Sequence, residues 1–581
     1  MNAKAILEDL REFVEQEHLA NQAKLFSVWE KPLAAKLQSG ETQLISQLRS
    51  ETKNHLILNV EKGDSRFREG DMICLHQGNP KQTTQVRQAV IEAENNGEWL
   101  VRTFNHDLSN LDWDDGDIYA DPDSMDLKPF YQKALNDLAS TKVGQSIVLP
   151  LLAGNLDTDF IYCDNYDEAA DFAEAHGLND RQIDAVAKGV AAKYLACIQG
   201  PPGTGKTQVI SMIVQRLITE GQRVLVTSHT HMAINNALNK IAEQGVTVAK
   251  VGAAACNKGL NSGVKHFSHA DDWQNRPDSG YAIGATPFAT CSSRLENFEF
   301  DTAIFDEASQ ITVPLAVMAM RKARRYVFVG DHKQLPPVVL SKSVLHNKAF
   351  SAFAKLMATN QQSATLLNQT YRMNRELSRW PGKQYYDGQL ISAGRNAMRK
   401  FSLPKQPAKY LEVFSDKHAF VFIESPGTNA KTSNTAEAEL VVDLLANAVD
   451  AGLELSDVGL ISPYRSHSKI MRKMMAKRFG TLTAKAAVVD TVERMQGQER
   501  EIVIVSLCTT DPQFLIAVAA FLFQSERLNV AITRPKTKLI LIGPKLADDF
   551  CLGGNNRVLS NSLADYRSLV QAAYCYTLGE N

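Results

Sequence analysis

The sequence predicts an α/β protein in which two tandem parallel-sheet domains follow a helical N-terminal segment that carries a small β-barrel. Three observations support this architecture. Short, almost wholly apolar runs alternate with helical segments from Leu178 to Gly543, which is typical of parallel strands buried on both faces. A glycine-rich phosphate-binding motif lies between the first of these strands and its helix. Around residues 60–120, short alternating runs broken by glycine indicate antiparallel hairpins.

Length and composition limit the class of protein. A chain of 581 residues is too long for a single hydrophobic core, and no apolar run approaches the roughly 20 residues of a membrane-spanning helix. The eight cysteines are scattered without any C-x-x-C pair, which argues against a zinc ribbon or a disulfide framework and favours a cytoplasmic location. A net charge of −2 means that any nucleic-acid site must be a local groove.

The N-terminal part is expected to contain three pieces. Residues 1–58 have apolar side chains at helical spacing and predict a helical stalk. Residues 59–122 predict the small barrel, and 123–177 predict further stalk or linker helices, with helical spacing at Leu127–Thr141. The acidic cluster from Asp112 to Asp117 does not have the spacing of a calcium-binding EF-hand, so we interpret Asp115-Gly116 as a hairpin turn.

The two sheet domains are expected at 178–345 and 346–550, with a C-terminal tail at 551–581. Only the first of them contains the phosphate-binding motif. The predicted strands share high β-propensity and near-continuous hydrophobicity, and they are RVLVTS (223–228), YAIGAT (281–286), TAIFDE (302–307) and RYVFVG (325–330) in the first domain, then AFVFIE, VGLIS, AAVVDT, EIVIVSL and KLILIG in the second.

The phosphate-binding motif matches G-x-x-x-x-G-K-[ST] at every fixed position. Its glycines let the backbone wrap closely around a phosphate with the N–H groups pointing inward, and the helix that follows adds its positive N-terminal end. The lysine reaches the β- and γ-phosphates, and the hydroxyl that follows it binds Mg²⁺. The predicted cofactors are therefore ATP and Mg²⁺, held by Gly200, Gly203, Thr204, Gly205, Lys206 and Thr207.

Two acids end the predicted strand TAIFDE. In a phosphate-loop enzyme the first, Asp306, belongs on Mg²⁺, and the second, Glu307, can deprotonate an attacking water. A metal ligand and a base together indicate hydrolysis. The amide of Gln334 in VGDHKQLPPVV can bond the γ-phosphate or the water, and the amide of Gln182 in LNDRQ can read the adenine edge.

The second domain contributes two candidate arginines. Arg372 in TYRMNREL and Arg534 in RLNVAITRPK are each placed to face the first domain across a cleft. An arginine supplied across such a cleft stabilises the charge that builds on the γ-phosphoryl oxygens during hydrolysis. A single arginine is more often a surface ion pair, so these two are assigned a role only through their motifs.

Together these blocks, which cover about 178–543, resemble superfamily 1 (1B) helicases of the Upf-like branch, which contains the nonsense-mediated-decay RNA helicases and their DNA-acting relatives. The matching segments follow in family order: LNDRQ, GPPGTGKT, FDEAS, GDHKQLPPVV, QTYRM with WPGKQYYDGQL, SNTAEAEL, LISPYRSH, VDTVERMQGQE and RLNVAITRPK. The resemblance implies two RecA-like domains with ATP between them, and a stalk with an inserted barrel. It also implies that Tyr371 stacks on the base, that Glu499 contacts ribose, and that Arg372 and Arg534 are arginine fingers.

Nucleic-acid contacts follow from the same resemblance. VTSHTHMAINNAL offers Thr230 and GATPFAT offers Thr286 from the first domain; the second domain offers Pro463, Tyr464, Arg465 and Thr491. Hydroxyls that grip the backbone suit a motor that steps on any sequence, although the same hydroxyls are also common helix caps. Histidines stand at 229, 231 and 467, where the family usually has proline, asparagine and glutamine. We interpret the first two as polar residues rather than metal ligands.

The function expected from the sequence is an ATP-dependent helicase or translocase acting on single-stranded nucleic acid and duplex junctions, with 5′-to-3′ movement implied by the resemblance. Two alternatives stay open at this point. One is a nucleic-acid-stimulated ATPase that acts as a switch or scaffold without unwinding, and the other is a small-molecule phosphotransferase. DNA and RNA are not distinguished, because both kinds of substrate use the same motor.

Overall fold

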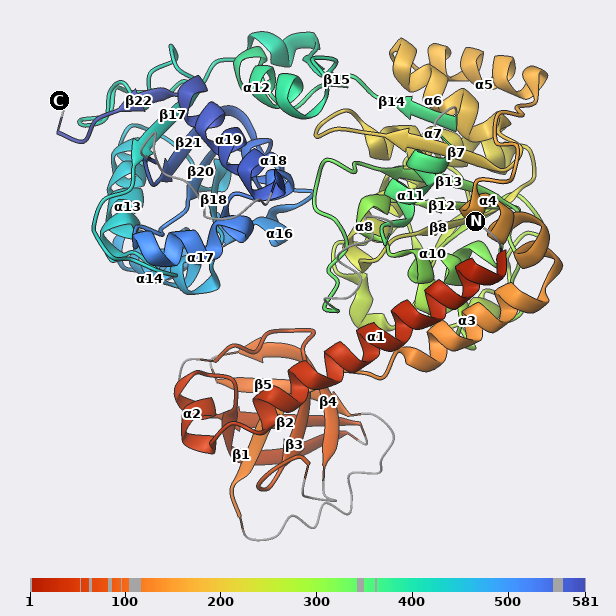
Figure 1. Ribbon diagram of the computed structural model, residues 1–581, viewed down its shortest axis with the longest axis horizontal. Helices are drawn as coiled ribbons and strands as arrows, with labels where there is room; N and C mark the ends of the chain where they lie inside the picture. Colours follow the sequence, from red (N-terminus) through yellow and green to blue (C-terminus); the bar gives the residue numbers. More distant parts are fainter. Residues whose placement is uncertain are drawn as a thin grey trace.

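The protein was analysed as a computed structural model that describes residues 3–52, 54–61, 65–81, 86–95, 97–103, 116–341, 350–360, 363–546 and 557–579. Figure 1 shows two α/β domains and a β-barrel that is joined to the first domain by one long helix. That helix, α1 (Ala3–Trp29), buries Ile6, Leu10 and Val14 in the core of the first domain. At its other end the Trp29 indole donates to the Pro122 carbonyl oxygen of the barrel at 2.9 Å.

The stalk is completed by helices that pack on α1 and on the first domain. The predicted helix at Leu127–Thr141 is confirmed as α3 (Lys128–Ser140), which contacts both α1 and the first domain. The remaining elements before the first sheet are α2 (Leu33–Gln38), the π-helical turn η2 (Gly144–Val148), α4 (Leu149–Ala153) and α5 (Cys163–Ala175).

The barrel is closed by six strands in the order β1-β2-β5-β4-β3-β6. It begins earlier than the sequence predicted: residues 43–52 and 55–58, expected to be helical, belong to its first two strands. The alternation of buried Leu56 and Leu58 occupies a strand of only six residues, too short to be told from the end of a helix by periodicity. Asp112–Asp115 of the acidic cluster lie outside the described residues. The strands are β1 (Gln43–Thr52), β2 (His55–Val60), β3 (Met72–His76), β4 (Arg87–Asn95), β5 (Glu98–Thr103) and β6 (Ile118–Pro122).

The first domain is built on an eight-stranded parallel sheet in the order β10-β9-β11-β8-β12-β13-β7-β14. The last strand corrects the predicted boundary at residue 345, because β14 pairs with β7, the strand that leads into the phosphate loop. Its strands are β7 (Leu195–Gln199), β8 (Arg223–Thr227), β9 (Val248–Val251), β10 (Lys265–Phe267), β11 (Tyr281–Gly284), β12 (Thr302–Phe305), β13 (Arg325–Gly330) and β14 (Ala364–Leu366). Its helices are α6 (Asp180–Ala191), α7 (Lys206–Thr219), α8 (His231–Ala242), α9 (Pro287–Thr290), α10 (Val313–Met320) and α11 (Ala352–Thr359).

The second domain has a six-stranded parallel sheet in the order β19-β18-β20-β21-β17-β22. The prediction of a separate C-terminal tail is wrong in part, because residues 557–576 form a helix and the edge strand β22 of this sheet. The strands are β17 (Phe420–Glu424), β18 (Val458–Ser462), β19 (Val488–Thr491), β20 (Arg500–Ser506), β21 (Pro535–Gly543) and β22 (Tyr574–Tyr576). The helices are α12 (Arg375–Tyr385), α13 (Thr435–Asp450), α14 (Arg465–Phe479), α15 (Thr481–Ala484), α16 (Val492–Met495), α17 (Pro512–Leu522), α18 (Ser525–Ile532) and α19 (Arg557–Ala572). A two-stranded ladder, β15 (Gln369–Thr370) with β16 (Ile391–Ser392), lies between the domains in the chain.

Each sheet has a hydrophobic core on both faces, as the continuous apolar runs predicted. In β7, Leu195 and Cys197 belong to one core, whereas Ala196 and Ile198 belong to the other, because successive side chains of a strand point to opposite faces. No single helix among the described residues is long and apolar enough to cross a membrane; only α17 and α18 together, bent by 79°, reach the required length and composition.

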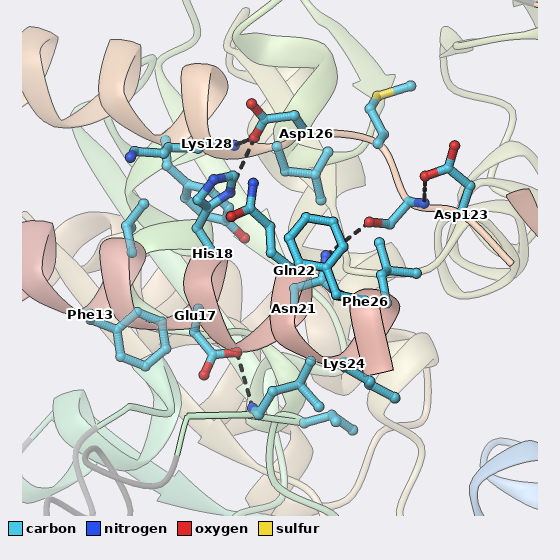
Figure 2. A pocket seen from close by; sticks show the side chains of 18 of the residues that line it. Phe13, Glu17, His18, Asn21, Gln22, Lys24, Phe26, Asp123, Asp126 and Lys128 are labelled. Carbon is cyan, nitrogen blue, oxygen red and sulfur yellow. Dashed lines mark hydrogen bonds and ion pairs between the residues drawn. The ribbon is translucent and has the colours of Figure 1, made fainter. Parts of the chain in front are cut away.

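The stalk also holds the segment that leaves the first sheet after β13. A cavity of about 480 Å³ lies between α1, the 123–128 segment and this stretch of chain; Figure 2 shows side chains that line it. At its floor the Glu17 carboxylate accepts hydrogen bonds from the backbone N–H groups of Leu340, at 3.0 Å, and Ser341, at 2.6 Å. The helix that carries the barrel is thereby tied to the chain that follows Gln334.

Candidate functional site

A cavity of about 360 Å³ lies where the two sheet domains meet. Residues of both domains line it, and most were predicted from sequence. Its lining from the first domain is Pro202, Gly203, Thr204, Gly205, Lys206, Thr207, Glu307 and Gln334; from the second side it is Tyr371, Arg372, Gly497, Glu499 and Arg534. The structure therefore places the phosphate loop, the second acid and both candidate arginines around one space.

The phosphate loop has the backbone conformation that its glycines allow. Gly203 has φ +75° and Gly205 has φ +85°, in the left-handed region that favours glycine. Gly203 is also excluded from carrying a side chain by crowding, since a Cβ there would lie 2.5 Å from Cβ of Arg372. Lys206 begins α7, and its ammonium donates to the Gly200 carbonyl oxygen at 2.7 Å. The lysine is thus held over the loop.

Gln182 lies beneath the loop rather than in the cavity lining. Its Nε2 donates to the Thr204 carbonyl oxygen at 3.0 Å, and its Oε1 accepts from the Asn179 backbone N–H at 3.2 Å. The second of these bonds is half of a capping box that starts α6. One end of the amide thus supports the loop and the other caps α6, and a role in reading adenine remains a prediction.

The two acids follow the buried strand β12. Burial, followed by the negative charge of Glu307, raises the pKa of Asp306 to about 7. Glu307 has φ +50°, a left-handed backbone that costs a side-chain-bearing residue about 1–2 kcal/mol. Its Oε2 accepts from Nε2 of Gln496, in the second domain, at 3.3 Å. The strand end therefore concentrates negative charge, which the charge of Lys206 offsets only in part.

Gln334 connects the cavity to a buried polar network. Its Nε2 donates to the Asp331 carboxylate at 2.7 Å, and its Oε1 lies 3.5 Å from the guanidinium of Arg534. The same Asp331 oxygen accepts from the Tyr386 hydroxyl at 2.6 Å, and that hydroxyl accepts from Nδ2 of Asn529 at 2.9 Å. The candidate γ-phosphate sensor is thus joined to the second domain by two routes.

Arg534 is buried and carries its charge without a salt bridge among the described residues. Its guanidinium donates to the carbonyl oxygens of Val530, at 2.8 Å, and Gln498, at 3.3 Å. Burial, followed by the like charge of Arg372, lowers its pKa to about 9, so it stays protonated at neutral pH. An anion entering the cavity would meet this unpaired cation.

Arg372 and Glu499 form a direct pair. The guanidinium of Arg372 donates to the Glu499 carboxylate at 2.8 Å and to the Thr533 carbonyl oxygen at 3.1 Å. Burial alone would raise the pKa of Glu499, but its ion pairs with Arg372 and Lys536 lower it overall. Tyr371 is 39% exposed at the cavity rim, and its hydroxyl accepts from Nδ2 of Asn179 at 2.7 Å. The base-stacking and ribose-contact roles stay predictions.

Sequence reasoning missed three residues of this interface: Gln496, Tyr386 and Asn529. Each lies inside a segment that had been singled out, namely VDTVERMQGQE, WPGKQYYDGQL and RLNVAITRPK. What marks them is a hydrogen bond to a partner at the domain interface, with Tyr386 and Asn529 buried there and Gln496 half-buried. Spacing along the chain does not reveal such contacts.

The candidate nucleic-acid residues all lie at or just beyond the carboxyl ends of parallel strands. Thr230 caps α8 by accepting from the Ala233 backbone N–H at 3.3 Å, which is the alternative role considered for it. Thr286 precedes α9 and Thr491 precedes α16 without side-chain capping bonds. Pro463, Tyr464 and Arg465 join β18 to α14, and Arg465 is exposed. Their contacts with nucleic acid stay predictions.

The three unusual histidines differ in their surroundings. Burial lowers the pKa of His229 and lowers that of His231 to about 4. Within the described ranges, no three His, Cys, Asp or Glu side chains are grouped to hold a metal ion. His467 is fully buried in the second domain, where Nε2 lies 2.7 Å from Oγ of Ser506. It therefore faces the core and not the surface expected to hold the strand.

Two family models match the part of the chain that contains the two sheet domains. A family model described as an AAA domain matches residues 177–395, and a second with the same description matches 349–546. The human DNA replication ATP-dependent helicase/nuclease DNA2 is 30% identical over 401 residues, covering 63% of this chain and 37% of that protein. The Xenopus laevis protein of that name is 31% identical over 400 residues, with the same two shares.

The Schizosaccharomyces pombe relative, dna2, is 28% identical over 433 residues, covering 70% of this chain and 30% of its own length. The chain thus spans about a third of the length of these curated relatives. Among solved structures, an arterivirus nonstructural protein 10, a helicase, has a TM-score of 0.37 and 15% identity over 92% of this chain and 82% of that chain.

Proposed function

Because this chain belongs to the superfamily 1 helicases, in the Upf-like branch that includes DNA-acting relatives, we propose that it is an ATP-dependent motor that moves along single-stranded nucleic acid and opens duplex junctions. One observation carries the proposal. The phosphate loop and Glu307 of the first domain line the same cavity as the arginines of the second domain, so hydrolysis of a nucleotide there changes what holds the two domains together.

The residues present fit ATP with Mg²⁺. Asp306 and Glu307 are neighbouring carboxylates, the first of them buried, and burial raises the pKa of Asp306. A divalent cation held by Asp306 and the Thr207 hydroxyl would offset the negative charge of the two carboxylates. When bound, Mg²⁺ would neutralise charge on the β- and γ-phosphates. Lys206 would hold the phosphates, and Glu307 would accept the proton of the attacking water. Arg534 and Arg372 would stabilise the charge of the transition state.

The substrate we propose is single-stranded DNA first and RNA second. The relatives named above are described as acting in DNA replication, which favours DNA, whereas the grip by hydroxyls on the backbone is common to both polymers. The family resemblance supports the proposal that movement is from 5′ to 3′. A cytoplasmic location is supported by the seven described cysteines, all of which are free.

The experiment that tests the proposal measures ATP hydrolysis with no polymer, with single-stranded DNA, and with single-stranded RNA. We expect stimulation by at least one polymer, loss of all turnover in Lys206→Ala, and unwinding of a 5′-tailed duplex. Stimulation without unwinding would leave the switch or scaffold as the correct function. Hydrolysis that no polymer stimulates would contradict the motor and favour a phosphotransferase.

A further inference from the structure

One loop of the barrel touches both motor domains. Arg68 and Glu69 precede the turn at Gly70, and the adjoining Phe67 is buried in the barrel core, which fixes their backbone. The Glu69 carboxylate lies 3.7 Å from the ammonium of Lys258 in the first domain. The guanidinium of Arg68 lies 4.0 Å from the carboxylate of Asp490 in the second domain. The barrel therefore meets the motor at a defined point.

Asp490 is surrounded by more positive charge than it can neutralise. Besides Arg68, its carboxylate lies 3.5 Å from the guanidinium of Arg472 on α14 and 4.0 Å from that of Arg494 on α16. Burial and then the charges of Arg494 and Arg465 lower the pKa of Arg68, outweighing the opposite effect of Asp490. Three guanidiniums around one carboxylate leave an excess of two positive charges in a chain whose net charge is −2.

The side chains remain accessible to a ligand. Arg472 is 44% exposed and Arg494 is 51% exposed, while Asp490 itself is 17% exposed. The backbone of Asp490 is fixed in β19, and its Oδ1 accepts from the Thr491 N–H at 2.8 Å. Guanidiniums that converge on one oxyanion match the oxygens of a phosphodiester, which they bind with paired hydrogen bonds.

We propose that Arg68, Arg472 and Arg494 form a phosphate-binding site for the single strand between the barrel and the second domain, and that Asp490 occupies this site in place of a phosphate when the strand is absent. The inference rests on the proposed function. It adds to that function a binding path for the strand that continues from Thr491 and Arg465 onto the barrel. It also makes Asp490 a competitor that the strand must displace.

The test is the affinity for a fluorescent oligothymidylate, measured without nucleotide over a range of salt concentrations. Arg68→Gln should weaken binding several-fold and lower the slope of log affinity against log salt by about 0.7, the value for one phosphate contact on a single strand. Arg66→Gln is the matched control. Arg66 lies on the same loop as Arg68, but its guanidinium is paired with the Glu41 carboxylate at 2.9 Å. Arg494→Gln, on the surface of the second domain, should repeat the effect of Arg68→Gln.

Asp490→Asn should change the affinity for the oligothymidylate in the opposite direction. The amide keeps the acceptor for the Thr491 N–H but removes the competing charge, so affinity should rise several-fold, and this gain should shrink in an Arg68→Gln background. Asp450→Asn, which removes a carboxylate paired with Arg478, should leave affinity unchanged.

Three results would overturn this inference but not the proposed function, provided that the wild-type protein binds the single strand. The first is that Arg68→Gln and Arg494→Gln both bind it as Arg66→Gln does. The others are that Asp490→Asn gains no affinity, or that the arginine variants lose affinity only for a blunt-ended duplex. If the wild-type protein binds no nucleic acid at all, the proposed function fails and this inference fails with it.

Discussion

Arg534 is the side chain in the cavity whose state depends most on what binds there. Its charge is buried, no carboxylate of the described chain forms an ion pair with it, and its like-charged neighbour Arg372 is held by Glu499. A γ-phosphate would satisfy it, and the demand grows as charge develops during hydrolysis.

Arg534→Ala should therefore lower kcat by about a thousandfold, the lower end of the range for arginine fingers, while the affinity for ATP changes far less. Steady-state hydrolysis and binding of a fluorescent nucleotide separate the two quantities. Arg534→Lys should recover only part of the rate, because an ammonium lacks the planar fork. A variant that loses affinity at unchanged kcat would show that Arg534 only binds the ground state.

We expect His467 to make the stability of the protein depend on pH. Burial lowers the pKa of its imidazole to about 4, whereas the unfolded chain has the ordinary value of about 6.5. Between these values the unfolded chain binds a proton that the folded chain does not. The resulting stability is present above about pH 6.5 and is lost as pH falls towards 4.

His467→Gln should remove that loss, about 2 kcal/mol at pH 5, while glutamine keeps a donor for Ser506 and an acceptor for Asn434. The drop in thermal midpoint between pH 8 and pH 5 should be smaller in this variant than in the wild type. The exposed His176→Gln is the control. Equal drops in all three proteins would mean that His467 does not titrate as described.

Among whole elements, the stalk helix α1 makes the least expected contact. Glu17 accepts from two backbone N–H groups of the segment that follows Gln334, and hydrogen bonds to a charged acceptor contribute about 1.5–3 kcal/mol each. The helix that positions the barrel thereby restrains the chain that leaves the γ-phosphate sensor.

Glu17→Ala should free this segment, so amide hydrogen exchange at Leu340 and Ser341 should become at least about tenfold faster, as expected for a loss of about 1.4 kcal/mol. Glu15→Ala on the same helix removes an ion pair with Lys128 at 2.6 Å and serves as the control. Equal protection in Glu17→Ala and wild type would show that packing, rather than this carboxylate, holds the segment.

Elements with strong local signals were predicted well, and elements defined by long-range pairing were not. The strands that follow one another in β–α alternation, such as β12 and β13, were read directly from buried apolar runs. In contrast, β14 has only three residues, and its membership of the first sheet depends on pairing with β7, more than 150 residues earlier. The same holds for β22, whose partner β17 is equally distant along the chain. Short strands carry too few residues for a period to be visible.

The site was predictable to the extent that chemistry follows strand ends. Lys206, Glu307 and Gln334 come after β7, β12 and β13, and carboxyl ends of parallel strands share one edge of the sheet. Sequence spacing gave no access to Tyr386 and Asn529, because their role depends on how the second domain docks. The residues of the site that could be identified only from the structure therefore lie at the interface between the domains.

At the scale of the whole molecule, the buried hydroxyl of Tyr386 joins the two domains, and we expect it to couple them. It donates to Asp331 and accepts from Asn529, and Asp331 in turn accepts from Gln334. A change at the γ-phosphate that moves Gln334 must therefore disturb a contact with the second domain. Removing the hydroxyl leaves buried polar partners unsatisfied, at a cost of about 1–3 kcal/mol.

Tyr386→Phe should accordingly reduce the stimulation of ATP hydrolysis by single-stranded DNA, measured as the ratio of turnover with and without polymer, while nucleotide affinity is retained. The adjacent Tyr385 is a matched control, because its hydroxyl is also buried but has no hydrogen-bond partner among the described residues, so Tyr385→Phe should stimulate normally. Since the two substitutions remove the same atom at neighbouring positions, any difference between them reports the hydrogen bonds and not the loss of volume. An equal stimulation ratio in both variants would place the coupling elsewhere, on the direct approach of Arg534 to Gln334.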